Sequence, residues 1–265
     1  MADAKQQHER LPPVLTGKKA LIVGVANEHS IAWGCAQAMR RAGAEIAMTY
    51  LNDRARPHVE PLAKALDAEI FLPLEVRDPA QVDGLFAQIA ERWGGLDILV
   101  HSVAFAPRDA LQGRVVDCPR DGFLAAMDVS CWSFLDLARR AESLMRQGGT
   151  MMTMSYLGAN EVVDNYGIMG PVKAALEASV RYLATEFGPG GIRVNAVSPG
   201  PMRTRAASGI AGFDDLIADA QRRAPLTREV EIDDVGSLCA FLVSDAARAI
   251  TGDVHYIDGG LHILA

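Results

Sequence analysis

Short apolar runs alternate with amphipathic stretches along almost the whole chain. Continuous rather than alternating hydrophobicity is typical of strands covered on both faces, and helical patterns between such strands imply right-handed βαβ crossovers. The sequence therefore predicts an α/β fold, a single-domain doubly wound parallel sheet of Rossmann-like type with helices on both faces. The predicted strands are KALIVGV (19–25), AEIAMTY (44–50), IFLPLEV (70–76), LDILVHSV (96–103), GTMMTMSY (149–156), IRVNAVSPG (192–200) and VHYIDGG (254–260).

Patterns of helical period lie between these runs, and glycines follow several of them. A chain of 265 residues suits one α/β domain with one large core. We expect a polar N-terminal tail over 1–15 and a single domain over 16–265. The predicted helices cover 31–42, 57–66, 79–93, 121–146, 168–187, 214–223 and 232–245.

Charge and cysteine usage exclude several classes of protein. A formal net charge of −7 without a basic stripe argues against nucleic-acid binding. No segment holds ~18 uninterrupted apolar residues, so we expect no membrane span. Cys35, Cys118, Cys131 and Cys239 show neither metal-ligand spacing nor the density of a secreted disulfide scaffold. We expect reduced core thiols, a cytoplasmic protein and no metal site.

Ligands of such sheets bind beyond the carboxyl ends of the strands. After the first strand, GVANEHSIAWG supplies Gly24 for a turn and Ser30 as a cap for a helix that begins at Ile31. Free amide groups at that helix terminus can hold a pyrophosphate. The G-x-G-x-x-G fingerprint is absent, so this loop alone fits an ordinary strand-to-helix connection equally well.

The ends of the second and third strands bear on the choice of cofactor. An NAD enzyme usually has an acidic residue at the second strand end and an NADP enzyme an arginine. Residues 50–52 carry no charge, Asp53 opposes a 2′-phosphate, and Arg54 and Arg56 attract one. We therefore favour NADH over NADPH and leave the second open. Glu75, at the end of the third strand, is placed to accept a hydrogen bond from the adenine amino group.

The fifth strand is followed by NYGIMGPVK, in which Tyr166 precedes Lys173 by seven residues. On a helix, positions i and i+7 share a face but lie ~10 Å apart along the axis. Such a spacing arises readily by chance, so the position of the pair after a predicted strand carries more weight. His101 lies inside the fourth apolar run, and we expect a hydrogen-bonded core histidine with no catalytic role.

Several motifs, in this order and at these separations, resemble the bacterial enoyl-acyl-carrier-protein reductases, a divergent branch of the short-chain dehydrogenase/reductase superfamily. They are GVANEHSIAWG, HSVAFAP, SYLGA, NYGIMGPVKAALEASVRYLA, IRVNAVSPGPMRTRAASGI and the closing DGG. The resemblance runs from about Thr16 to Ile263. It implies NADH-dependent reduction of trans-2-enoyl thioesters in fatty acid biosynthesis, a homotetramer, and a mobile substrate-binding segment at about 201–225.

The implied reaction gives a reason for the seven-residue spacing. Hydride passes from the nicotinamide to the β-carbon of the enoyl group, and the resulting enolate is protonated at the α-carbon. In a carbonyl reductase, hydride lands on the carbon that bears the oxygen, whereas here the oxyanion develops two carbons away. The tyrosine must therefore move relative to the nicotinamide.

The resemblance also implies roles for single residues. Tyr166 corresponds to the residue that hydrogen-bonds the enolate oxygen, Lys173 to the one that holds the nicotinamide ribose, and Tyr156 to a second active-site tyrosine beside the acyl group. The other implied cofactor-binding residues are Gly24, Ser30, Ile31, Leu51, Glu75, Val76, Val103, Met202, Arg203, Thr204, Arg205 and Ala206. The implied substrate-binding residues are Ala106, Tyr156, Met169, Ile210 and Phe213.

Three positions depart from the family pattern. Leu51 stands where a polar residue is common, and Glu75 where an aspartate is common, so adenosine recognition is the least regular part of the match. Ala104 replaces a glycine beside the space where diphenyl-ether inhibitors such as triclosan stack on the nicotinamide. An added methyl group fills that space, which predicts weaker inhibition.

The segment SGIAGFDDLIADAQRR also departs from the pattern, because Asp214 and Asp215 stand where the family has basic residues that meet acidic carrier proteins. The substrate is therefore either an acyl-carrier-protein thioester, or enoyl-CoA or a specialised carrier in a paralogue. Two wider alternatives are a ketone or alcohol oxidoreductase of the superfamily and a silent dinucleotide-binding regulator. The arginines at positions 203, 205, 222 and 223 flank this segment and can form the basic patch at a different place.

Overall fold

The computed structural model describes residues 13–204 and 212–264. Its sheet has seven strands in the order β3-β2-β1-β4-β5-β6-β7, and all neighbouring strands are parallel. The winding reverses between β1 and β4, which confirms the predicted doubly wound sheet. The strands are β1 (Lys19–Val23), β2 (Glu45–Tyr50), β3 (Ile70–Pro73), β4 (Ile98–His101), β5 (Gly149–Met154), β6 (Ile192–Pro199) and β7 (Val254–Ile257).

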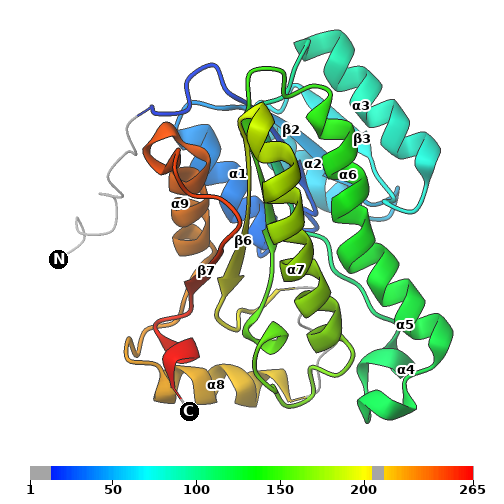
Figure 1. Cartoon of the computed structure of the whole chain (residues 1–265), viewed down its shortest axis with the longest axis vertical. Helices are drawn as coiled ribbons and strands as arrows, with labels where there is room; N and C mark the ends of the chain where they lie inside the picture. Colours follow the sequence, from blue (N-terminus) through cyan, green and yellow to red (C-terminus); the bar gives the residue numbers. More distant parts are fainter. Residues whose placement is uncertain (1–12, 205–211, 265) are drawn as a thin grey trace.

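Helices cover both faces of the sheet, and Figure 1 shows α8 beyond the ends of β6 and β7 rather than on a face. One apolar cluster joins α3, α6 and α7 to the sheet, and another joins α1, α2 and α9 to its opposite face. The helices are α1 (Ile31–Arg41), α2 (Arg56–Ala65), α3 (Pro79–Trp93), α4 (Arg108–Leu111), α5 (Arg120–Met127), α6 (Ser133–Glu142), α7 (Met169–Phe187), α8 (Phe213–Arg223) and α9 (Ile232–Val243).

The central strand β1 shows why the predicted strands are runs of apolar residues rather than alternating ones. Leu21 and Val23 belong to the first cluster, whereas Ala20 and Ile22 belong to the second. Successive side chains of a strand point to opposite faces, so a sheet covered on both faces needs apolar residues throughout. The neighbouring strand β4 is also covered on both faces, so it too needs apolar side chains on both.

Two glycines allow α1 and α9 to pack in close contact. A Cβ atom on Gly236 would lie 2.3 Å from the carbonyl oxygen of Gly34, and one on Gly34 would lie 2.3 Å from that of Ile232. Such distances exclude any side chain at either position. The pair fixes the position of α1, the helix that follows β1.

The helix predicted over 121–146 is continuous as far as Glu142, but it contains a π-helical turn that was not predicted. The structure has α5, a π-helical turn η2 (Asp128–Trp132) and α6, which ends at Glu142. The Ser133 hydroxyl donates to the Val129 carbonyl at 2.7 Å. Such π-helical turns occur often at functional sites, and this one directs two serines toward β4 and the loop that follows it.

Within residues 13–204 and 212–264, no helix is long and apolar enough to cross a membrane. The same residues contain no group of three or more His, Cys, Asp or Glu side chains that could hold a metal ion.

The cysteines are free thiols, but Cys118 is only half-buried, so the expectation of a core thiol is wrong for this residue. The single-domain boundary at residue 16 stays a prediction.

Candidate active site

The turn after β1 leaves no room for a side chain. Val23 pairs with His101 of β4, which sets the two strand ends level. Gly24 has φ +110°, and a Cβ atom there would lie 2.1 Å from the carbonyl oxygen of Ser102. Only glycine fits this backbone. The glycine lets this turn pack directly against the main chain of Ser102, at the edge of the sheet where dinucleotides bind in such folds.

Ser30 occupies the N-cap position of α1, but its side chain does not cap the helix, so that expectation is wrong. Its hydroxyl oxygen instead accepts hydrogen bonds from the amides of Ala26 at 3.0 Å and Asn27 at 3.1 Å. These bonds hold the loop between β1 and Ile31 in shape. The Ser30 side chain therefore leaves the N-terminus of α1 to other acceptors, such as a phosphate group.

The expected adenosine end lies at the ends of β2 and β3. Leu51 is 52% exposed, which leaves an apolar surface for a base or ribose to cover. The Glu75 carboxylate accepts two bonds from the Arg77 guanidinium, at 3.1 Å and 3.3 Å. These bonds hold the pKa of Glu75 below its usual value. Arg77, which the sequence analysis did not single out, thus orients the acid expected to meet the adenine, beside half-buried Val76.

The loop after β4 is fixed by the π-helical turn. The Ser130 hydroxyl accepts from the Phe105 amide at 2.9 Å and donates to the Phe105 carbonyl at 3.0 Å. Val103 and Ala106 pack against the core, whereas Ala104 between them is exposed. This arrangement leaves the Ala104 methyl group on the open side of the loop.

Tyr156 and Tyr166 form a pair with ring centroids 4.8 Å apart and planes inclined by 57°. Tyr166 is 7% exposed, and burial raises its pKa. Burial and the charge of Asp258 raise the pKa of Tyr156 to about 12. Both phenols therefore stay protonated near neutral pH and can donate a hydrogen bond to a developing oxyanion.

Tyr166 does not lie on the helix that carries Lys173. Helix α7 begins at Met169, and Asn165, with φ +59°, turns the chain just before Tyr166. A Cβ atom on Gly158 would lie 2.3 Å from Cδ1 of the Tyr166 ring. The seven-residue spacing is therefore not a helical i, i+7 relation, because a turn and a glycine contact position the tyrosine.

Lys173 is buried one turn inside α7, and its Nζ donates to the carbonyl oxygen of Met154 at 2.6 Å. Burial lowers its pKa to about 8, partly opposed by nearby Cys131 and Glu177. The ammonium group therefore lies at the end of β5 and is charged near neutral pH. Its two remaining N–H donors can reach hydroxyl groups such as those of a ribose.

His101 is a buried core histidine, as predicted. Its Nδ1 lies 2.9 Å from the Thr153 hydroxyl and its Nε2 lies 2.8 Å from the Ser133 hydroxyl. Burial lowers the pKa of His101 to about 3. Both ring nitrogens are occupied and the ring is neutral, so it has no proton to supply.

The expected contacts from the end of β6 onward are described only in part. Met202 is buried, and the Arg203 guanidinium bonds the Asp214 carboxylate. The Thr204 amide donates to the Met202 carbonyl at 2.8 Å. Met169 is buried at the first residue of α7. Three of the expected residues lie outside the described part of the chain, namely Arg205, Ala206 and Ile210. The side chain of Phe213 also lies outside it.

A sequence model described as "Enoyl-(Acyl carrier protein) reductase" matches residues 24–262 of this chain. The chain belongs to this family. A Rhizobium meliloti enoyl-[acyl-carrier-protein] reductase [NADH] 2 is 47% identical over 94% of this chain and 93% of its own. Escherichia coli FabI, also an enoyl-[acyl-carrier-protein] reductase [NADH], is 46% identical over 95% of this chain and 96% of its own.

Solved structures of other enoyl reductases match the fold closely. The Anaplasma phagocytophilum enzyme in complex with NAD superposes with a TM-score of 0.93 at 45% identity, over 97% of this chain and 98% of its own. A Bacillus cereus enzyme with NADP+ and indole naphthyridinone superposes with a TM-score of 0.93 at 42% identity, over 95% of this chain and 99% of its own. These matches confirm the family resemblance and the fold predicted from the sequence.

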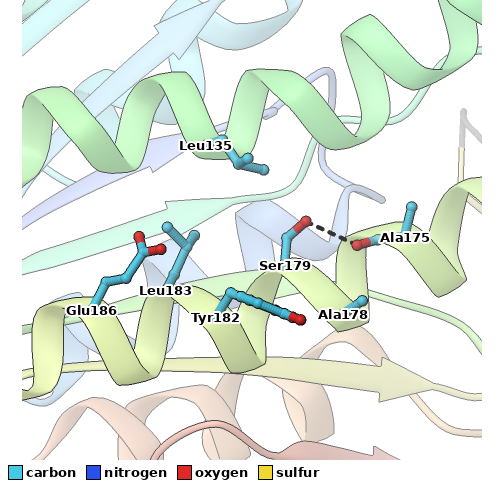
Figure 2. A pocket seen from close by; sticks show the side chains of 7 residues that line it. All are labelled: Leu135, Ala175, Ala178, Ser179, Tyr182, Leu183 and Glu186. Carbon is cyan, nitrogen blue, oxygen red and sulfur yellow. Dashed lines mark hydrogen bonds between the residues drawn. The ribbon is translucent and has the colours of Figure 1, made fainter.

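This enoyl reductase also has a shallow pocket between α6 and the outer face of α7, and Figure 2 shows Leu135 above the α7 side chains. In this view, Ser179 donates to the Ala175 carbonyl at 2.9 Å. Neither active-site tyrosine nor Lys173 lines this pocket. The pocket is therefore separate from the group of Tyr156, Tyr166 and Lys173.

Ser130 and Glu177 hold the loops around the site of this enoyl reductase, and neither was predicted from the sequence. Glu177 is an acid on an apolar helix face, four residues after Lys173. That position was a visible signal, because acidic residues are seldom buried without a partner. Ser130 had no such signal, since its role depends on the π-helical turn.

Proposed function

We propose that this enzyme reduces trans-2-enoyl thioesters of acyl carrier protein with NADH, in fatty acid biosynthesis. The observation that carries the proposal is the group formed by half-buried Tyr156 with buried Tyr166 and Lys173 at the end of β5, in a chain of the enoyl reductase family. A bound nicotinamide supplies the hydride for the β-carbon of the substrate. The protein must then stabilise the enolate and exclude water.

Tyr166 donates its phenolic proton as a hydrogen bond to the thioester oxygen, where negative charge develops. Its raised pKa keeps the proton on the tyrosine when no oxyanion is present. Lys173 holds the nicotinamide ribose through the donors that Met154 leaves free. Tyr156 packs beside the acyl chain and shields the oxyanion from water.

The deciding experiment mixes the protein with NADH and crotonyl thioester and follows absorbance at 340 nm. Loss of absorbance supports enoyl reduction. Turnover of a β-ketoacyl thioester without turnover of crotonyl thioester would assign a ketone reductase instead. Binding of NADH with turnover of neither substrate would assign a dinucleotide-binding regulator.

NADH is the proposed cofactor because the nearest cations at the end of β2 are engaged or opposed. The Arg56 guanidinium lies 5.9 Å from the Tyr50 ring centroid and 3.6 Å from the Glu60 carboxylate. Asp53 adds a negative charge that repels a 2′-phosphate. A higher kcat/KM with NADPH than with NADH would overturn this choice.

A second candidate substrate is an enoyl group on CoA or on a specialised carrier. On α8, the Asp219 carboxylate pairs with Arg222 and with Arg223, and Arg203 pairs with Asp214. These pairs weaken the attraction that α8 can offer to an acidic carrier protein. The test compares kcat/KM for one enoyl chain on carrier protein and on CoA, at low and high salt. A strong carrier preference that fades with salt would exclude the second candidate.

We further propose a cytoplasmic homotetramer. Tyr182 on the outer face of α7 is 72% exposed and Trp132 is 57% exposed, as expected of a surface that another copy covers. Light scattering after size-exclusion chromatography measures the assembly, and cell fractionation measures the location. A monomer at working concentrations, or activity in the membrane fraction, would contradict these proposals.

A further inference from the structure

A buried carboxylate lies one helical turn beyond the catalytic lysine. Glu177 on α7 is 4% exposed, although it follows Lys173 by only four residues on an otherwise apolar helix face. Burying a carboxylate without partners is strongly unfavourable, so the groups that bond it have a defined position. The role of Glu177 can therefore be read from those partners.

Both hydrogen-bond partners of Glu177 lie on one segment of chain that leaves β5. The Ser155 hydroxyl donates to Oε1 at 2.5 Å, and the Asn160 side-chain amide donates to Oε2 at 3.0 Å. The two partners flank the short helix η3 (Leu157–Ala159). One carboxylate thus clamps residues 155–160 at both ends against α7.

The clamped segment, together with Met154 directly before it, meets every catalytic side chain. Met154 accepts the hydrogen bond from Lys173, and the Tyr156 ring packs at an incline against Tyr166. Gly158 lies under the Tyr166 ring so closely that a methyl group there would lie 2.3 Å from Cδ1. A shift of this segment relative to α7 therefore displaces both tyrosines relative to the lysine.

A second contact continues from the clamp to the end of β7. The Asn160 amide also donates to the Tyr256 hydroxyl at 3.1 Å. The Tyr256 ring stacks on His262 with centroids 4.0 Å apart, and Nδ1 of His262 lies 3.0 Å from the Asp258 carboxylate. Asn160 therefore joins the clamped segment to the C-terminal part of the fold.

We propose that Glu177 is a positioning residue for enoyl reduction, whose carboxylate fixes the 155–160 segment so that Tyr156 and Tyr166 meet the substrate beside Lys173. The inference rests on the proposed function. Glu177 makes no contact with substrate or cofactor in this proposal. Glu177 contributes by fixing the positions of the two tyrosines, because small displacements of catalytic groups lower rates strongly, by ~100-fold per ångström in sensitive cases.

The experiment compares Glu177→Ala, which removes the clamp, with Glu177→Gln, which keeps an acceptor for Ser155 but lacks the charge. Glu186→Gln, an exposed acid on the same helix, is the control. At pH 6.5, where Lys173 stays protonated, we expect Glu177→Ala to lower kcat by ~10 to 100-fold with KM for NADH nearly unchanged, and Glu177→Gln to retain more activity. The control should match the wild type. An unchanged kcat in Glu177→Ala would overturn the inference.

A double-mutant cycle separates positioning from a merely structural role. If Glu177 acts through the tyrosine, adding Tyr166→Phe to Glu177→Ala should cost far less than Tyr166→Phe costs in the wild type. Losses of kcat that multiply would refute positioning. If Glu177→Ala does not fold, the double-mutant cycle is made with Asn160→Ala and Tyr166→Phe instead, because Asn160 is exposed. Losses of kcat that multiply in that cycle would also refute the proposal.

The proposed function is tested separately by the wild-type protein. No reduction of crotonyl thioester by the wild type would remove the proposed function, and this inference with it. If the wild type is active, and the Glu177→Ala and Asn160→Ala variants are each as active as the wild type, the inference is refuted and the proposed function stands.

Discussion

The ammonium group of Lys173 donates a hydrogen bond to the main-chain carbonyl of Met154 at 2.6 Å. Met154 is the last residue of β5, so this bond fixes the lysine at the edge of the sheet where a dinucleotide is expected to lie. The lysine is almost fully buried, and the strand end rather than solvent holds its charge. Its protonation state should therefore control cofactor binding.

NADH affinity of the free enzyme should fall as the pH rises through about 8, the lowered pKa of Lys173. Below that pH the group is protonated and can donate to the ribose, whereas above it the charge is lost. Lys173→Ala should bind NADH ~10 to 100-fold more weakly, the range for a charge-assisted hydrogen bond of ~1.5 to 3 kcal/mol. Fluorescence titration between pH 6.5 and 9.5 measures both effects. A wild-type affinity that does not change with pH would contradict this assignment.

Tyr166→Phe should lower kcat by ~100 to 1,000-fold, or ~2.7 to 4 kcal/mol, because it removes one donor to the oxyanion. NADH affinity should change little, since the ring and its packing against Tyr156 are kept. Tyr182→Phe, which removes a phenolic hydroxyl from the proposed subunit interface on α7 and not from the site, is the matched control. Steady-state kinetics with crotonyl thioester measure both variants. Equal small effects would show that Tyr166 is not the oxyanion donor.

Gly158→Ala should impair catalysis without unfolding the protein. Its methyl group would lie 2.3 Å from the Tyr166 ring, so the ring must move. We expect a loss of ~10 to 100-fold in kcat, as for other displaced catalytic groups. Gly188→Ala is the control, because no atom lies within 4 Å of a Cβ there. Circular dichroism checks that both variants stay folded, and wild-type kcat in Gly158→Ala would disprove the contact's role.

Ala104→Gly should strengthen inhibition by triclosan at least ~5-fold, because an extra methyl in a packed space typically costs ~1 to 3 kcal/mol. Ala104 is exposed on a loop that the Ser130 bonds to Phe105 hold in place, which limits how far the backbone can yield. The inhibition constant at saturating NAD+ measures the effect. An unchanged constant would mean that the loop absorbs the methyl group.

The sequence by itself determined the sheet. A strand covered on both faces is apolar at consecutive interior positions, as residues 20–23 of β1 and 98–100 of β4 are, and this requirement is local enough to be read from consecutive residues. It also determined the family, because the motifs at the strand ends keep their order and separations along the chain. Even so, the π-helical turn inside the helix expected over 121–146 could not be predicted, since α5 and α6 each keep helical periodicity on either side of it.

Only the tertiary structure decided how the side chains of the candidate active site are held. Lys173 meets a carbonyl 19 residues earlier in the chain, and Glu177 meets a hydroxyl 22 residues earlier. Tyr166 lies before α7 rather than on it, placed by a turn and by contact with Gly158. Hydrophobic periodicity records which face of an element is buried, but not the path of a loop between two elements. The clamp around Glu177 depends on that path, so it became visible only when α7 and the end of β5 were brought together.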